Sequence, residues 1–250
     1  MKFKRPSSPL GALDAFDGLL LVDKPAGPTS HDIVDEIRRH FRLEKVGHGG
    51  TLDPMATGLL IILLGRGTKL SNYIMGADKV YEGLMHLGVT TDTEDLDGKV
   101  LTEADCSSVT LESVEREMAK LVGDLMQTPP MVSAVKQNGV PLYKLARKGK
   151  TVEREPRLIH IYEFKLLDFS LPWVRFRLRC TKGTYVRTLC ADIGRALGCG
   201  AYLEQLRRTQ SGSMKVENAI GFETILGLDL EQLTKHVVPI HQLLIDKMKA

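Results

Sequence analysis

The stretch Gly47-His48-Gly49-Gly50-Thr51-Leu52-Asp53-Pro54-Met55-Ala56-Thr57-Gly58-Leu59-Leu60 decides how the rest of the chain is interpreted. It holds four glycines, one proline, one histidine and a single carboxylate within fourteen residues. Glycine costs roughly 1 kcal/mol inside a helix, so several occur together only where the backbone turns tightly or approaches another group closely. The stretch therefore predicts a loop with Asp53 at its turn, and the apolar run 59–64 predicts a buried strand directly after it.

Two side chains of this loop are candidates for chemistry. An Asp-Pro pair alone is ordinary turn chemistry, but a carboxylate on a tight loop at the edge of a sheet is a common way to present a reactive group. Asp53 is therefore a candidate catalytic residue. His48 has two interpretations, a hydrogen bond within the glycine loop or a contact with a ligand, and the residues alone favour the hydrogen bond.

Length and composition limit the class of protein. A chain of 250 residues allows one large domain or two small ones. Its apolar runs are far shorter than the roughly 20 residues that span a bilayer, and residues 1–6 lack an apolar signal core, so we expect a cytoplasmic protein with no membrane partner. The four cysteines, Cys106, Cys180, Cys190 and Cys199, have no C-x-x-C spacing and are interpreted as reduced packing residues without a metal.

The pattern of apolar residues predicts alternating strands and helices. Strands are expected at 18–24, 79–87 and 173–180, where the last alternates Val174, Phe176, Leu178 and Cys180 with three arginines. Helices are expected after an N-cap at Ser30, after Thr110 and from about residue 186, and two short helical patterns follow residue 216.

Positive charge gathers in one segment. The net charge of +3 is too small to indicate a nucleic-acid partner, but residues 136–157 carry seven lysines and arginines against two glutamates. Such a segment suits a phosphate backbone, and it is equally compatible with a solvated surface loop. Arg175, Arg177 and Arg179 on the predicted strand pose the same choice, and a solvated face is the favoured interpretation for them.

Two further features concern acids. Residues 90–98 hold several acids before Gly98, but an EF-hand loop with that glycine at its sixth position would begin at Thr93 and need an acid at Ala104, so a polar turn is predicted in place of a calcium site. Arg187 falls near the start of a predicted helix, where a cation opposes the helix dipole. We therefore expect Arg187 to have a carboxylate partner.

The chain resembles the TruB-type tRNA pseudouridine synthases over residues 18–212, in one collinear order. The resemblance lies in the Asp53 stretch, in T-D-T-x-D at 91–95, in P-P-M-x-S-A-x-K at 129–136, in L-Y-x-x-A-R-x-G at 142–149, in K-G-T-Y-V-R at 182–187 and in the Leu206 segment 203–209. Val132 departs from the aromatic residue often found there. The resemblance implies an α+β fold with a largely antiparallel central sheet flanked by helices and loops.

The resemblance also implies roles for individual residues. Asp53 would be the catalytic residue, Arg187 would pair with it, and Tyr81 would stack on the flipped base and take part in proton transfer. Substrate contacts would come from these further residues: His48, Asp95, Tyr185, Leu206, Lys144, Arg147 and Lys148. Asp95 would lie beside Arg187, and residues 127–156 would form an insertion that grips the RNA.

The implied activity is the isomerisation of a uridine to pseudouridine in the T loop of tRNA, at position 55 by tRNA convention. No cofactor and no metal is implied, and we expect a monomer whose partner is the T arm of tRNA. The expected divisions are an N-terminal extension at 1–17, a catalytic domain at 18–215 and a short helical segment at 216–250. An RNA-binding domain of the PUA kind is expected to be missing.

Two other classes of protein stay open at this point. A glycosidase would use two acids about 5 to 9.5 Å apart, which Asp53 and Asp95 could supply, but its cleft should be rich in aromatic residues and the chain has one tryptophan. An RNA-binding module without catalysis would use Asp53 merely to turn a loop. An unmodified tRNA transcript separates the three classes by its product: isomerised uridine, released base or binding alone.

Overall fold

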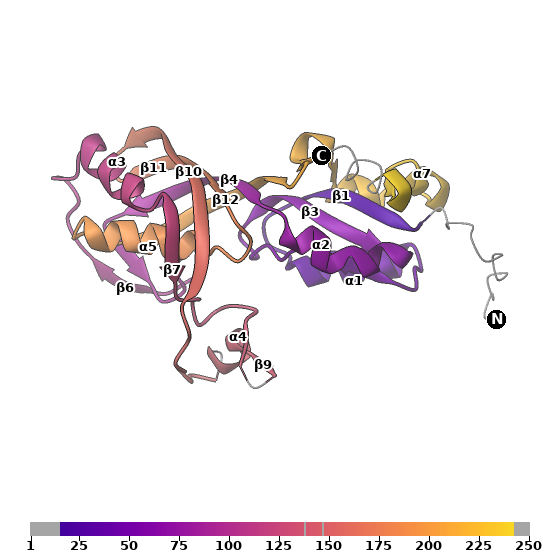
Figure 1. The fold of residues 1–250 in the computed structure, drawn as a ribbon, viewed down its shortest axis with the longest axis horizontal. Coiled ribbons are helices and arrows are strands. Elements are labelled where there is room, and N and C mark those ends of the chain that lie inside the picture. The colour runs from indigo at the N-terminus through magenta and orange to yellow at the C-terminus, as the bar shows by residue number, and fades with distance from the viewer. Residues whose placement is uncertain (1–15, 138, 147, 243–250) are drawn as a thin grey trace. The chain divides into compact units, whose positions relative to one another are not determined.

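The computed structural model describes residues 16–137, 139–146 and 148–242 (Figure 1). The chain divides into two compact units, with residues 1–76 and 214–250 in unit 1 and residues 77–213 in unit 2. Within the described residues, no helix is both long and apolar enough to cross a membrane. The expected divisions at residues 17 and 215 stay a prediction.

Unit 1 is built on the pair of strands β1 and β3. They run antiparallel in continuous register, from Gly18 opposite Leu64 to Lys24 opposite Gly58. β2 pairs with β3, while β15 joins β1 antiparallel and β14 joins it parallel. The elements of unit 1 are β1 (Gly18–Lys24), α1 (Ser30–His40), β2 (Val46–His48), β3 (Thr57–Leu64), η1 (Gly65–Leu70), α2 (Ser71–Gly76), β13 (Met214–Lys215), η2 (Val216–Asn218), β14 (Ile220–Gly221), α6 (Phe222–Leu226), α7 (Leu230–Thr234) and β15 (Val237–Pro239).

Both faces of this strand pair are buried. Leu19, Leu59 and Ile61 form part of a core cluster with Ile74 and Val216. The alternate residues on the opposite face of β1 and β3 are just as inaccessible, namely Leu20, Val22, Leu60 and Ile62. Because alternate side chains leave a strand on opposite sides, the unbroken apolar run needs cover on both sides, and the predicted buried strand at 59–64 is confirmed.

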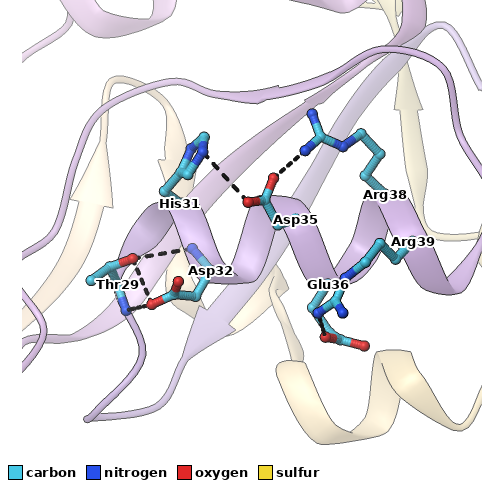
Figure 2. Close-up of polar contacts among 7 residues, drawn as sticks. All are labelled: Thr29, His31, Asp32, Asp35, Glu36, Arg38 and Arg39. Atoms are coloured by element: carbon cyan, nitrogen blue, oxygen red, sulfur yellow. Dashed lines mark hydrogen bonds and ion pairs between the residues drawn. The ribbon is translucent and has the colours of Figure 1, made fainter.

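Helix α1 begins one residue earlier than the sequence suggested. Thr29 is its N-cap, since the Thr29 side chain accepts the backbone N–H of Asp32 while the Asp32 carboxylate accepts the backbone N–H of Thr29 (Figure 2). This reciprocal arrangement satisfies two amides that the helix itself leaves without partners. The assignment of Ser30 as N-cap was therefore wrong, and its hydroxyl serves another purpose that is described with the site.

The outer side of α1 carries ion pairs one turn apart. Figure 2 shows Arg38 reaching Asp35, which also faces His31, and Arg39 reaching Glu36. The paired side chains are 34% to 72% exposed, and ion pairs that water reaches in this way add little to stability. The pattern marks a solvated helix face.

Unit 2 holds an antiparallel sheet in the order β12-β4-β11-β10-β7. The predicted strands at 79–87 and 173–180 are confirmed as β4 and β11. The elements of unit 2 are β4 (Lys79–Leu87), β5 (Val89–Thr91), β6 (Val100–Glu103), α3 (Leu111–Lys120), β7 (Gly123–Gln127), β8 (Lys136–Gln137), β9 (Val140–Pro141), α4 (Leu142–Ala146), β10 (Arg157–Ser170), β11 (Trp173–Cys180), α5 (Val186–Ala196) and β12 (Ala201–Ser211).

The core of unit 2 forms along β11. All four inward residues of the predicted alternation are fully buried, including Phe176, whose ring meets that of Phe164 edge to face at 5.3 Å. Gly83 on β4 lies opposite Phe176, and a Cβ at that position would come within 2.3 Å of the ring. Gly83 is thus required by the aromatic side chain across from it. Helix α5 packs on β12, and its Leu189, Cys190 and Ile193 are buried.

These elements confirm an α+β fold with largely antiparallel sheets. Thr110 caps α3 as expected, and α6 and α7 correspond to the two short helical patterns after residue 216. Cys180, Cys190 and Cys199 are buried and Cys106 is half-buried, all as free thiols, which confirms the interpretation of the cysteines as packing residues.

Candidate active site

The Asp53 loop joins β2 to β3 in unit 1, and main-chain contacts fix it on both sides of the aspartate. On the near side, the Ser30 hydroxyl donates to the Leu52 carbonyl at 3.0 Å and accepts the Leu52 N–H at 2.8 Å. On the far side, the Gly27 N–H donates to the Pro54 carbonyl at 2.9 Å. Asp53 itself is half-buried. Because Leu52 and Pro54 are both held by hydrogen bonds, the backbone that carries its carboxylate is fixed.

A buried lysine completes this support. Lys24, at the end of β1, has no exposed surface, and its ammonium donates to the carbonyls of Pro25, Pro54 and Ala56 at 2.8, 3.0 and 2.8 Å. An ammonium offers three donors, and a buried one is tolerated only when its donors find acceptors. Lys24 therefore ties the strand end to the two carbonyls that flank Met55, directly after Asp53.

His48 lies at the end of β2, before the glycine pair. Its Nδ1 accepts the backbone N–H of Gly50 at 3.4 Å, and Gly50 has φ +136°, a value that side chains disfavour. This contact matches the structural interpretation of His48 as a residue hydrogen-bonded within its own loop. Its role toward a nucleotide stays a prediction.

In unit 2, Arg187 and Asp95 form a buried ion pair. Nη1 of Arg187 donates to Oδ2 of Asp95 at 2.8 Å, and the two side chains are only 3% and 5% exposed. The second terminal nitrogen, Nη2, donates to the carbonyl of Val132. Asp95 is thus a carboxylate partner of this arginine at a helix start, and its other oxygen accepts from the Thr93 hydroxyl and the Asp97 N–H. The pairing of Arg187 with Asp53 stays a prediction.

Tyr185 is the N-cap of α5 and stands next to this pair. The Gln127 side chain holds its backbone, because Nε2 of Gln127 donates to the Tyr185 carbonyl at 3.1 Å and Oε1 accepts the Tyr185 N–H at 2.8 Å. The Arg187 guanidinium carbon lies 5.8 Å from the centre of the tyrosine ring, within cation–π range. Sequence analysis missed Gln127, since an amide that pairs with backbone leaves no motif.

Tyr81 and Leu206 share one face of the unit 2 sheet. Leu206 on β12 lies opposite Gly83 on β4, two residues from Tyr81, and side chains at that spacing project from the same side. Leu206 is 7% exposed, whereas Tyr81 is half-buried. Arg187, Asp95 and Tyr185 are thus brought together by direct contacts, and Tyr81 and Leu206 are brought together by strand register.

The basic segment forms a small folded insertion. α4 and β9 stand apart from the sheet of unit 2 (Figure 1), and β8 pairs with β9. Leu142 is buried, and its N–H is bonded to the Val135 carbonyl at 2.8 Å. Lys144 and Lys148 are exposed, while Arg147 lies outside the described residues. The insertion therefore presents lysines outward on a defined backbone.

Two of the three strand arginines contact side chains on neighbouring strands. Arg177 lies 3.3 Å from Glu163 and 4.0 Å from Glu82, and Arg179 lies 4.8 Å from the centre of the Tyr162 ring. This pattern fits the solvated face that the sequence favoured for them. Among residues 16–137, 139–146 and 148–242, no three His, Cys, Asp or Glu side chains form a group that could hold a metal ion.

Comparison with known families gives two matches that together cover most of the chain. Residues 38–186 match the model described as TruB family pseudouridylate synthase (N terminal domain). Residues 187–245 match the model described as tRNA pseudouridylate synthase B C-terminal domain.

Similar individual proteins agree with these matches. The tRNA pseudouridine synthase B of Opitutus terrae is 51% identical over 227 residues, which cover 91% of this chain and 94% of that protein. The tRNA pseudouridine synthase B of Geotalea uraniireducens is 53% identical over 205 residues, which cover 82% of this chain and 66% of that protein.

Two solved structures share the fold. A chain from "Crystal Structure of a Cbf5-Nop10-Gar1 Complex" superposes with a TM-score of 0.72 at 32% identity, covering 91% of this chain and 61% of that one. A chain from "Structure of H/ACA RNP bound to a substrate RNA containing 2'-deoxyuridine" gives a TM-score of 0.68 at 28% identity, covering 90% and 60%.

Proposed function

This chain belongs to the TruB family of pseudouridylate synthases, and from that premise we propose that it isomerises the uridine in the T loop of tRNA, with Asp53 as the catalytic carboxylate. Membership of an enzyme family sets aside the non-catalytic module and the glycosidase. The observation that carries the assignment of Asp53 is its place on a loop held from both sides by Ser30, Lys24 and Gly27.

The reaction rearranges a nucleoside without changing its mass. The bond between C1' of the ribose and N1 of the uracil breaks, the base turns over, and a new bond forms between C1' and C5. The proton that leaves C5 is balanced by one taken up at N1, so no oxidant, reductant or water is consumed. An ionised carboxylate can attack carbon or accept a proton, and either role suits a half-buried Asp53.

Residues of unit 2 are assigned to handling the base. Tyr81 provides an aromatic surface that replaces the stacking lost when the base leaves the RNA helix, and Leu206 and Tyr185 help to exclude water so that the detached uracil is not lost. Arg187, held in place by its ion pair with Asp95, supplies a fixed cation. His48, which belongs to unit 1, is assigned to the space that the extruded nucleotide leaves.

The insertion at 127–156 is assigned to the phosphates of the T arm. Exposed lysines on a folded loop suit a backbone that carries charge but no sequence information. Lys144, Arg147 and Lys148 are the proposed contacts. We further assign the enzyme to the cytoplasm, where it would act on tRNA as a monomer without a cofactor.

The test is to incubate the protein with an unmodified tRNA transcript and to measure pseudouridine after digestion. Asp53→Asn should bind the RNA as wild type does and should lower turnover by at least about a thousandfold, because the amide keeps the shape and loses the charge. Asp35→Asn, a partly exposed aspartate on the solvated face of α1, is the matched control and should leave turnover unchanged. Turnover of Asp53→Asn within tenfold of wild type would end the catalytic assignment, and pseudouridine in a transcript with cytidine at the T-loop position would end the site assignment.

A further inference from the structure

The turn between β5 and β6 directs two consecutive carboxylates at two consecutive residues of α5. Asp95 accepts from Arg187 at 2.8 Å, and Glu94 accepts the hydroxyl of Thr188, with 2.6 Å between Oγ1 and Oε2. The first contact belongs to the site already described. The second lies directly beside it, because Glu94 precedes Asp95 in the turn and Thr188 follows Arg187 in the helix.

The backbone of the turn is fixed in an unfavourable conformation at Glu94. Its φ is +64°, in the left-handed region that favours glycine or asparagine. Three hydrogen bonds hold it there: the Glu94 N–H donates to Thr91 at 3.2 Å, the Leu203 N–H donates to the Glu94 carbonyl at 3.0 Å, and the Leu96 N–H donates to Leu203 at 3.0 Å. A glutamate is therefore kept where glycine would be less strained, which suggests that its side chain is used.

The surroundings of the Glu94 carboxyl are mixed. Burial raises its pKa, while the Thr188 hydroxyl and the Arg187 charge lower it. Further along α5, Asp192 raises this pKa and Arg195 lowers it. On its own turn the nearest acid, Asp95, is engaged by Arg187, and β12 meets Glu94 through the Leu203 backbone. The carboxyl thus titrates above the ordinary range of a glutamate.

The contact of the Glu94 carboxylate with the first turn of α5 has an electrostatic consequence. Thr188 is the third residue of the helix, and the first turn of a helix favours negative charge. Arg187 brings a positive charge to that same turn. Glu94 supplies a second anion there, so the helix start that carries Arg187 is held by two carboxylates from one rigid turn.

We propose that Glu94 is a positioning residue for Arg187, which it holds in place by fixing Thr188 and with it the first turn of α5. The proposal rests on the proposed function, in which Arg187 acts on the flipped uridine. Glu94 itself touches no reacting atom. It sets the orientation of the guanidinium, so its loss should slow the chemical step and leave RNA binding intact.

The experiment measures the single-turnover rate constant of pseudouridine formation with the full chain in excess over an unmodified tRNA transcript. Thr188→Val removes the hydroxyl and should lower the rate constant about tenfold, while Glu94→Gln keeps a weaker, neutral hydrogen bond and should lower it about threefold. Thr188→Ser restores the hydroxyl and should be within twofold of wild type. The dissociation constant for the transcript should change less than twofold in all of them.

The pH profile separates positioning from a merely structural role. Glu94→Gln resembles wild type with the carboxyl protonated, so the two rate constants should converge as pH falls through the raised pKa of Glu94. The threefold difference should hold at neutral pH. Because the contact is shared, adding Glu94→Gln to Thr188→Val should cause no further loss.

Asp92→Asn is the matched control, since Asp92 is an exposed acid of the same turn whose carboxylate accepts from the Lys99 backbone. It should be indistinguishable from wild type. The proposal would be overturned if Glu94→Gln and Thr188→Val both had the rate constant of wild type at every pH. It would also be overturned if both variants were slowed by the same factor at every pH and the double variant showed the sum of the two losses. A wild-type protein that forms no pseudouridine would instead overturn the proposed function.

Discussion

Asp95→Asn should strongly destabilise the protein. The Arg187–Asp95 pair is 3% and 5% exposed, so the variant removes the charge of the carboxylate that directly contacts a buried guanidinium. Breaking such a pair on one side costs about 3–5 kcal/mol, in contrast to the small net value of the intact pair. For a chain of this size each 1 kcal/mol lowers the melting temperature by about 2–4 °C, so the expected drop is about 6–20 °C.

The assay is chemical and thermal unfolding followed by circular dichroism, at low and at high salt. Glu36→Gln is the matched control, because it breaks an arginine–carboxylate pair whose side chains are 38% and 72% exposed. That pair should cost less than about 1 kcal/mol and fade with salt, whereas the Asp95→Asn loss should persist at 1 M salt, where the screening length is about 3 Å. An Asp95→Asn loss as small and as salt-sensitive as that of Glu36→Gln would refute the burial argument.

Three further predictions concern other parts of the molecule. Neutralising Lys144 and Lys148 together should weaken tRNA affinity and flatten its salt dependence by about 0.7–0.9 per lost phosphate contact, and parallel lines of log affinity against log salt would show that the insertion is only a solvated surface. Gln127→Glu puts a carboxylate oxygen against the carbonyl at the α5 N-cap and should lower both stability and turnover, while Gln127→Ala should be milder. Burial lowers the pKa of Lys79 from 10.5 to about 8, so Lys79→Met should be more stable than wild type at pH 7. This advantage should shrink as pH rises from about 8 toward 10.5, because in that range Lys79 is neutral in the folded wild type and still protonated in the unfolded chain.

Local periodicity was sufficient for much of the fold. The alternation along 173–180 reports directly which side of a strand faces the core, and its four apolar residues are all fully buried. The error at α1 shows where local rules stop. Thr29 and Ser30 are adjacent hydroxyl residues, and the acid three residues after Thr29 decides which of them caps the helix. The Ser30 hydroxyl is committed to Leu52, a partner 22 residues away that no local rule would select.

The part of the site that could be predicted from the sequence is the need of the Arg187 charge for a carboxylate. An arginine at a helix start required a carboxylate, but a sequence with 31 acids does not say which one, and Asp95 was selected only through the resemblance to a family. The Glu94–Thr188 contact joins residues 94 apart in sequence and depends on a left-handed residue in a turn. Sequence analysis treated that turn as a polar connection, since a positive φ at a glutamate has no signature in composition.

Lys24 shows most clearly why the rest of the site escaped prediction. A lysine between an apolar strand and a proline suggests a strand that ends at the surface, because isolated lysines are almost never fully buried. The acceptors at Pro25, Pro54 and Ala56 are backbone carbonyls, and every residue type has one, so the side chains of these three residues give no signal of a bound ammonium. The same reasoning applies to Gln127 and Ser30, which also bind main chain. Contacts of side chain with backbone fix the loop of Asp53 and the start of α5, and they become visible only when the fold has brought the carbonyls into place.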